Sequence, residues 1–121
     1  KHIKNFCHNN AQYSEIIKKA ISYIDSHLSD DTSSDAVASY VSLNSVYFRS
    51  LFKHCMGETF IAYLTRRRLE TACKLLLETD LKINAICNMI GYKNRTHFYK
   101  LFKNYYGKTP NEFRGGTDDS E

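Results

Sequence analysis

The feature that most constrains this chain is an internal repeat. Residues 48–63 and 98–113 align without a gap and share the pattern F-x-x-L-F-K-x-x-x-G-x-T-x-x-x-(Y/F). A weaker match lies upstream with a shift of one residue, and it pairs Val37, Ala38 and Val41 with Ile86, Cys87 and Ile90. Repetition of this kind indicates two copies of one supersecondary unit. Two copies are too few for a solenoid, so we expect a pseudo-symmetric pair.

The chain contains few residues that break helices. It has one proline and five glycines, of which Gly115 and Gly116 lie near its end. This scarcity, together with the helical spacing of Ile17, Ile21 and Ile24, predicts an all-α fold. We expect about seven helices, near residues 14–28, 34–41, 45–56, 59–77, 83–90, 94–106 and 110–114.

Each copy has the form of a helix-turn-helix, in which a short helix and a second helix are joined by a tight turn. The turns are predicted at residues 42–43 and 91–92. Gly91 suits a positive φ and Ser42 does not, so the first turn is expected to be less ideal. Residues expected to cap helices are Asn44, Thr59, Asn94 and Thr109 at the starts, with Pro110 and Glu112 supporting Thr109, and Gly57 and Gly107 at the ends.

Helical spacing divides the second helix of each copy into a buried and an outward face. The expected buried side chains are Phe48, Leu51, Phe52 and Cys55 in the first copy and Phe98, Leu101, Phe102 and Tyr105 in the second, while Tyr106 is expected at the surface. The outward residues of the first copy are Ser45, Val46, Arg49, Ser50 and Lys53. In the second copy, the outward or marginal residues are Arg95, Thr96, His97, Tyr99, Lys100 and Lys103.

These outward side chains favour contact with double-stranded DNA, because the second helix of such a motif lies in the major groove. Arg49 and Arg95 can each donate two hydrogen bonds to O6 and N7 of guanine. Val46 can pack on a thymine methyl group. The outward faces therefore predict sequence-specific recognition.

The other outward residues suit supporting contacts. Ser50 and Thr96 can bind a base edge or a phosphate, and His97 is equally suited to a contact or to packing at the margin of the core. Lys100 and Lys103 suit phosphates, which position a protein on DNA without specifying sequence.

The net charge of +4 is mild, but basic residues concentrate between residues 49 and 68 and between residues 93 and 108. A basic face toward phosphates and an ordinary solvated face explain this distribution equally well. The run Arg66, Arg67 and Arg68 is expected to form a solvated face.

Several classes of function find no support in the sequence. No apolar run is long enough to span a bilayer and no signal peptide opens the chain, which favours a cytoplasmic protein. No phosphate-binding glycine loop or catalytic dyad predicts an enzyme or a cofactor site. The cysteines form no CxxC motif, and Cys73 and Cys87 are expected to be buried thiols. A zinc site at Cys55 and His54, or a redox role for Cys55 or Cys73, are distant alternatives.

The ordered set of motifs resembles the DNA-binding domain of the AraC/XylS family of bacterial regulators over roughly residues 17 to 114. The most specific stretches are Arg68-Leu69 with Ala72-Cys-Lys-Leu-Leu-Leu-Glu-Thr, Ile83-x-x-Ile86, Gly91-Tyr92-x-Asn94, and Phe98-x-x-x-Phe102-Lys103-x-x-x-Gly107-x-Thr109-Pro110-x-x-Phe113-Arg114. The departures are Ser34 in place of a buried leucine, Asn44 for serine, Cys87 for alanine and Tyr92 for phenylalanine. Because of Ser34, the first helix of copy one is expected to be looser or shifted.

The resemblance implies a homeodomain-like tandem of two helix-turn-helix subdomains, 14–58 and 78–114, joined by a linker helix, 59–77. The two recognition helices would then lie in successive major grooves of one asymmetric promoter site. Family base-contacting positions correspond to Val46, Arg49 and Ser50 and to Arg95, Thr96, His97 and Lys100, and the helix N-termini near Asn44 and Asn94 would contact the DNA backbone. Lys53, on the outward face of the first copy, is also expected to bind DNA.

The same resemblance implies that residues 1–13 are a linker from an absent sensor or receiver domain and that 115–121 form a disordered tail. RNA polymerase is an implied partner. The alternative function is a helical protein-interaction module whose basic face binds an acidic partner. Salt-sensitive binding that prefers one duplex over a scrambled duplex would distinguish DNA recognition from that alternative.

Overall fold

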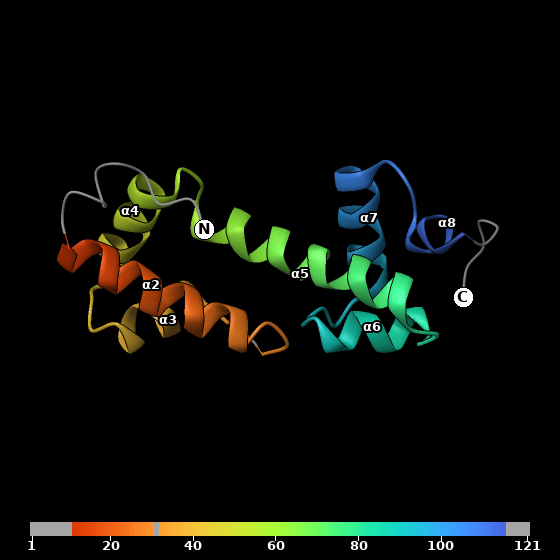
Figure 1. The fold of residues 1–121 in the computed structure, drawn as a ribbon, viewed down its shortest axis with the longest axis horizontal. Helices are drawn as coiled ribbons and strands as arrows, with labels where there is room; N and C mark the ends of the chain where they lie inside the picture. Colours follow the sequence, from red (N-terminus) through yellow and green to blue (C-terminus); the bar gives the residue numbers. More distant parts are fainter. Residues whose placement is uncertain (1–10, 31, 116–121) are drawn as a thin grey trace. The chain divides into compact units, whose positions relative to one another are not determined.

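The structure is a computed structural model that describes residues 11–30 and 32–115, and in these residues it contains helices and no strand (Figure 1). The predicted all-α fold is therefore confirmed. The helices are α2 (Ala11–Ser26), α3 (Ser34–Tyr40), α4 (Ser45–Met56), α5 (Phe60–Glu78), α6 (Ile83–Met89), α7 (Arg95–Tyr106) and α8 (Pro110–Arg114).

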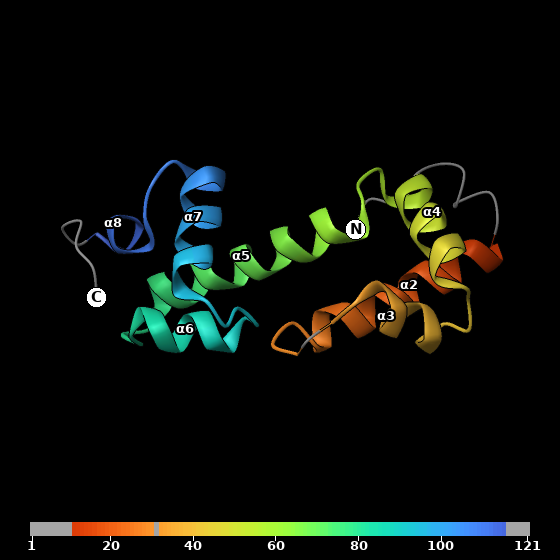
Figure 2. The same cartoon turned by 180° about the vertical axis from the view of Figure 1, so that it is seen from behind.

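The chain forms two compact units, one up to Arg66 and one from Arg67 onward, so the division falls inside α5. In the first unit α2, α3 and α4 pack together (Figures 1 and 2). In the second unit α7 contacts both α6 and α8. The proposed subdomain limits of 14–58, 59–77 and 78–114 remain a prediction.

Each unit has its own aromatic core. In the first, the rings of Phe52, Phe60 and Tyr63 are buried and meet edge to face, with centroids 5.6 to 6.1 Å apart. In the second, Phe98 and Phe102 are completely buried, and Phe102 lies 5.4 Å from Phe113. Such edge-to-face pairs add to the free energy gained by burying the rings.

The helix ends follow the predicted caps. The Asn44 side chain accepts hydrogen bonds from the backbone of Val46 and Tyr47, and the Asn94 side chain accepts one from His97. Thr109 and Glu112 form a complete capping box. The side chain of Thr59 accepts a hydrogen bond from Ala62 N, 3.1 Å away. Gly57 and Gly107 end α4 and α7 in the left-handed conformation, as predicted.

The two tight turns are the same despite their different sequences. Ser42 N donates to Ser39 O at 3.0 Å and Leu43 N to Ala38 O at 2.8 Å; the matching bonds from Gly91 and Tyr92 measure 3.2 and 3.0 Å. Ser42 has a φ of +61° and Gly91 a φ of +94°. Ser42 is therefore the less suitable residue for this turn, as expected, but packing and hydrogen bonds hold it in a conformation that serine alone disfavours.

The first helix of copy one is not shifted. The helix α3 begins at Ser34, which matches Ile83 at the start of α6. Ile83 is buried, whereas Ser34 is half-exposed. The side chain of Ser33 caps α3 by accepting from Ala36 N, and this cap fixes the start of the helix where the buried leucine of the family is absent.

Helix boundaries near the ends of the chain differ from the prediction. The helix α2 begins at Ala11, three residues before the predicted start near residue 14, so residues 11–13 of the predicted linker are helical. The other residues of that linker, 1–10, lie outside the described part. Gly115, the first residue of the predicted tail 115–121, ends α8 with a φ of +103°. The other residues of that tail, 116–121, also lie outside the described part.

The predicted burial of Tyr105 is wrong, and so is the surface position of Tyr106. Tyr105 is 47% exposed. The Tyr106 ring is half-buried and lies 4.7 Å from the ring of Phe102. Both tyrosines fall near the core side of α7, and the ring of Phe113 on α8, 5.9 Å from Tyr106, provides a packing surface for Tyr106.

The arginine run on α5 is not the solvated face that we expected. Arg68 is only 8% exposed and lies over the ring of Tyr92, 5.2 Å from its centroid. Arg66 forms a 2.7 Å ion pair with Glu58, and Arg67 forms a 2.8 Å ion pair with Glu70. The apolar methylene groups of these arginines pack on the core, while the guanidinium groups contact a carboxylate or an aromatic ring.

Cys73 and Cys87 are free thiols that differ in exposure. Cys87 is buried, as predicted, whereas Cys73 is only half-buried, so its predicted burial is met in part. Within residues 11–30 and 32–115, no three His, Cys, Asp or Glu side chains are placed to hold a metal ion. Over the same residues, no helix combines the length and apolar character needed to cross a membrane.

Replacing Gly107 by alanine should lower the free energy of unfolding by about 1 kcal/mol, because alanine is strained at a φ of +76°. No atom lies within 4 Å of the added Cβ, so the effect isolates backbone strain from crowding. Urea denaturation followed by circular dichroism measures it. Gly107→Asn is the control and should cost less, since asparagine tolerates this conformation. Equal losses for both variants would contradict the explanation.

Candidate nucleic-acid interface

The helix α4 is fixed at its first turn by its own N-cap residue and by a side chain of α3. Asn44 Oδ1 accepts hydrogen bonds from Val46 N at 2.8 Å and Tyr47 N at 3.1 Å. The Ser45 hydroxyl donates to the carboxylate of Asp35 on α3. The start of α4 is therefore attached to α3, the first helix of the motif.

The outward face of α4 carries the predicted residues. Val46 is 66% exposed, and Arg49, Ser50 and Lys53 are also exposed. Arg49 Nη1 donates to the Ser34 hydroxyl of α3 at 3.3 Å. The face thus combines an apolar side chain, a guanidinium and an ammonium, which suit a thymine methyl, a guanine edge and a phosphate.

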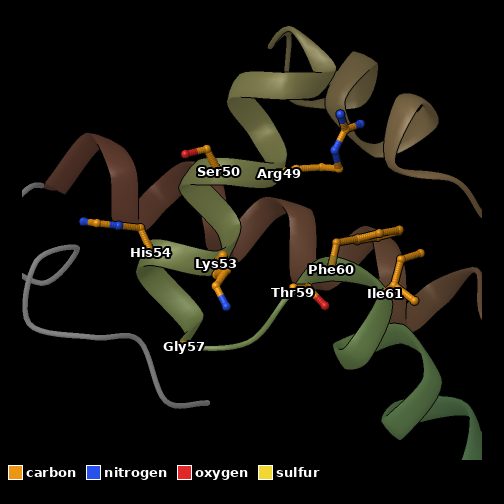
Figure 3. A pocket seen from close by; sticks show the side chains of 8 residues that line it. All are labelled: Arg49, Ser50, Lys53, His54, Gly57, Thr59, Phe60 and Ile61. Carbon is orange, nitrogen blue, oxygen red and sulfur yellow. The ribbon is translucent and has the colours of Figure 1, made fainter.

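A hollow of about 590 Å³ lies where α4 meets the start of α5 (Figure 3). The residues that line it are Arg49, Ser50, Lys53, His54, Gly57, Thr59, Phe60 and Ile61. In Figure 3 Phe60 and Ile61 point to the same side as Arg49, whereas His54 points to the other side of α4. Among the described residues that line the hollow, Arg49 and Lys53 are basic and none is acidic, so the charge of this lining suits an anion.

The helix α7 presents a second, more basic face. Thr96, His97 and Lys100 are exposed and Arg95 is half-exposed. The cap residue Asn94 accepts from His97 N at 3.0 Å. The His97 ring lies edge-on to the ring of Tyr92, with centroids 5.7 Å apart. His97 therefore packs against the margin of the core while it remains exposed to solvent. The α7 face therefore places cations at the surface beside a capped N-terminus.

The electrostatics of both helices favour a polyanion. Neither α4 nor α7 contains an acidic residue. Their N-termini add the positive ends of two helix dipoles. Two neutral groups nearby have raised pKa values. The hydrogen bond that Tyr47 donates to Tyr13 raises the pKa of Tyr47, and burial raises the pKa of Cys87, although Arg95 opposes this shift.

The structure also shows candidate residues that the sequence analysis missed. Tyr47 is 45% exposed on α4, and its hydroxyl donates to that of Tyr13 on α2 at 3.4 Å. Tyr47 occupies the repeat position of His97, so the register of the repeat was the signal that could have identified it. The exposed Ile61 in the hollow had no such signal, because it belongs to the following helix.

Comparison with known proteins places these motifs in one family. The family model described as "Helix-turn-helix domain" matches residues 37–116. The regulatory protein PocR of Salmonella typhimurium is 41% identical over 98 residues, which are 81% of this chain and 32% of that protein. The xylose operon regulatory protein of Escherichia coli K12 is 36% identical over 96 residues, which are 79% of this chain and 24% of that protein.

A solved structure agrees with this grouping. The C-terminal domain of AraT, a response regulator from Geobacillus stearothermophilus, superposes with a TM-score of 0.80 at 36% identity and covers 88% of each chain. The chain spans a quarter to a third of the two curated relatives named above. Both of those relatives are regulatory proteins.

Proposed function

Because this chain belongs to the AraC/XylS family of bacterial transcription regulators, as a helix-turn-helix DNA-binding domain, we propose that α4 and α7 each recognise bases of one asymmetric double-stranded site. The observation that carries the proposal is the repeated motif, in which both second helices have a capped N-terminus and an outward face without acidic residues. The two helices would occupy successive major grooves.

The side chains divide into base-contacting and phosphate-contacting groups. Arg49 and Arg95 donate to guanine, and Val46 packs against a thymine methyl group. The shorter polar residues Ser50, Thr96 and His97 contact neighbouring base edges or phosphates. Lys53 and Lys100, with the N-termini at Asn44 and Asn94, bind phosphates and set the register of the protein on the duplex.

Selection of duplexes from a random library tests this proposal. The wild-type chain should enrich one asymmetric motif with two short blocks. Arg49→Ala and Arg95→Ala should each relax one block and lower the free energy of specific binding by about 1–3 kcal/mol. Lys18→Ala, which removes an exposed cation from α2, is the control and should leave both blocks intact.

The outcomes separate the possible modes of binding. One enriched block would show that only one unit recognises bases. No enrichment, with salt-sensitive binding to any duplex, would overturn sequence-specific recognition and favour the protein-interaction alternative.

Contacts with phosphates can be distinguished from contacts with bases by the salt dependence of binding. Lys100→Ala should weaken binding to specific and scrambled duplexes by similar factors, and it should reduce the slope of log affinity against log salt by about 1. Titrations at several salt concentrations measure the slope. An unchanged slope would remove Lys100 from the backbone contacts.

For the whole protein, the family suggests a sensor or receiver domain in addition to this one, a cytoplasmic location and contact with RNA polymerase. These assignments are proposals, because the chain spans only part of its curated relatives.

A further inference from the structure

The two recognition helices carry their arginines at different positions of the repeat. In the fifty-residue register, Arg95 corresponds to Ser45 and Tyr99 corresponds to Arg49. The arginine of the second copy is therefore one helical turn closer to the N-terminus. A long aromatic side chain takes the place that the arginine has in the first copy.

The arginine of the first copy is held by a neighbouring helix. Arg49 Nη1 donates to the Ser34 hydroxyl on α3 at 3.3 Å. The second copy cannot form the equivalent hydrogen bond, because the residue that matches Ser34 is Ile83, an apolar side chain that is completely buried in the core.

Tyr99 provides a surface for the arginine of the second copy. The Arg95 guanidinium carbon lies 5.6 Å from the centroid of the Tyr99 ring, on the same helix and four residues away. Residues at this spacing lie on one face of a helix, and long side chains there lean toward the N-terminus, which brings the Tyr99 ring toward Arg95. The Tyr99 ring itself packs against the second core and lies edge-on to Phe98, 6.2 Å away.

We infer that Tyr99 is a positioning residue for DNA recognition: its ring holds the Arg95 guanidinium in a restricted position on the outward side of α7. The inference rests on the proposed function, since it assigns a support to a base-contacting residue. An arginine loses rotamer freedom when it binds a base, and a side chain already restricted by stacking loses less. Stacking also orients the planar guanidinium for bidentate hydrogen bonding.

The test compares Tyr99→Leu with Tyr99→Phe on the duplex selected by the wild-type chain and on a scrambled duplex. Loss of the ring should reduce the ratio of specific to scrambled affinity by about two- to fivefold, the size of an exposed cation–π contact. Tyr99→Phe retains the ring and should keep the wild-type ratio. The same substitutions in an Arg95→Ala background should change the ratio no further.

Four results would overturn the inference. An equal loss for Tyr99→Leu and Tyr99→Phe would assign the effect to the hydroxyl, and a loss that persists in the Arg95→Ala background would assign it to the fold. An unchanged ratio in Tyr99→Leu, with a reduced ratio in Arg95→Ala, would overturn the positioning role and leave the proposed function intact. An unchanged ratio in Arg95→Ala would overturn both.

Circular dichroism of each variant monitors folding. If Tyr99→Leu unfolds, Tyr99→Met replaces it, because the flexible methionine side chain fills irregular space in a core. Tyr105→Leu removes an exposed tyrosine from the other end of α7 and should bind like the wild type.

Discussion

Replacing Phe102 by alanine should lower the free energy of unfolding by about 3–5 kcal/mol. The Phe102 side chain is completely buried on α7, and its ring meets those of Phe98, Tyr106 and Phe113 at centroid distances of 5.8, 4.7 and 5.4 Å. Truncation removes the transfer free energy of the ring and leaves a cavity that these three rings cannot fill completely. Because small domains have only about 5–15 kcal/mol of stability, the second unit should be close to unfolding at room temperature.

Urea denaturation followed by circular dichroism measures the loss. Tyr105→Ala is the matched control, since it removes an aromatic ring of the same helix that is 47% exposed. It should change the free energy of unfolding by less than about 0.5 kcal/mol, the usual range for surface positions. Similar losses at residues 102 and 105 would contradict the assignment of buried and exposed faces on α7.

Replacing Arg114 by alanine should cost about 3 kcal/mol, a large effect for a half-buried side chain. Arg114 lies on α8, and its guanidinium donates from Nε to Leu76 O and from Nη2 to Thr79 O, each at 3.1 Å. These carbonyls end α5, where the last turn of a helix has no internal donors and its dipole favours a cation. Hydrogen bonds from a charged donor contribute about 1.5–3 kcal/mol each, and partial exposure reduces that sum.

The conservative variant separates the hydrogen bonds from the charge. Arg114→Lys keeps the positive charge but offers a single ammonium where the guanidinium reaches two carbonyls, so it should recover about half of the lost stability. Denaturation at low and at high salt completes the test. Stability of Arg114→Ala within about 0.5 kcal/mol of the wild type would show that water satisfies both carbonyls.

Local chemistry explains why much of the fold could be predicted. The caps at Asn44, Asn94 and Thr109 and the ends at Gly57 and Gly107 depend on residues within one helical turn, and all are present in the structure. The buried face of α4 follows from the 3.6-residue period alone. The outward positions of Val46, Arg49 and Ser50 follow from the same period, which explains why the candidate interface could be located before the structure.

The wrong predictions of burial concern residues whose surroundings are provided by other helices or by distant parts of the chain. A period of 3.6 residues does not decide between Tyr105 and Tyr106, because both fall near the edge of the buried face; the ring of Phe113, from another helix, decides it. Likewise, the sequence shows that Arg68 is charged, but only the packing of Tyr92 against it explains its burial.

The sequence by itself determined the helices, their caps, the repeat and the outward faces, because each depends on neighbours within a few residues. The tertiary structure alone decided the conformation of Ser42, the bond from Arg49 to Ser34, the contact of Arg114 with the end of α5 and the burial of Arg68. Each of these depends on groups brought together from separate elements or held by the packing around them. These interactions form only when the chain has folded, so no local pattern in the sequence predicts them.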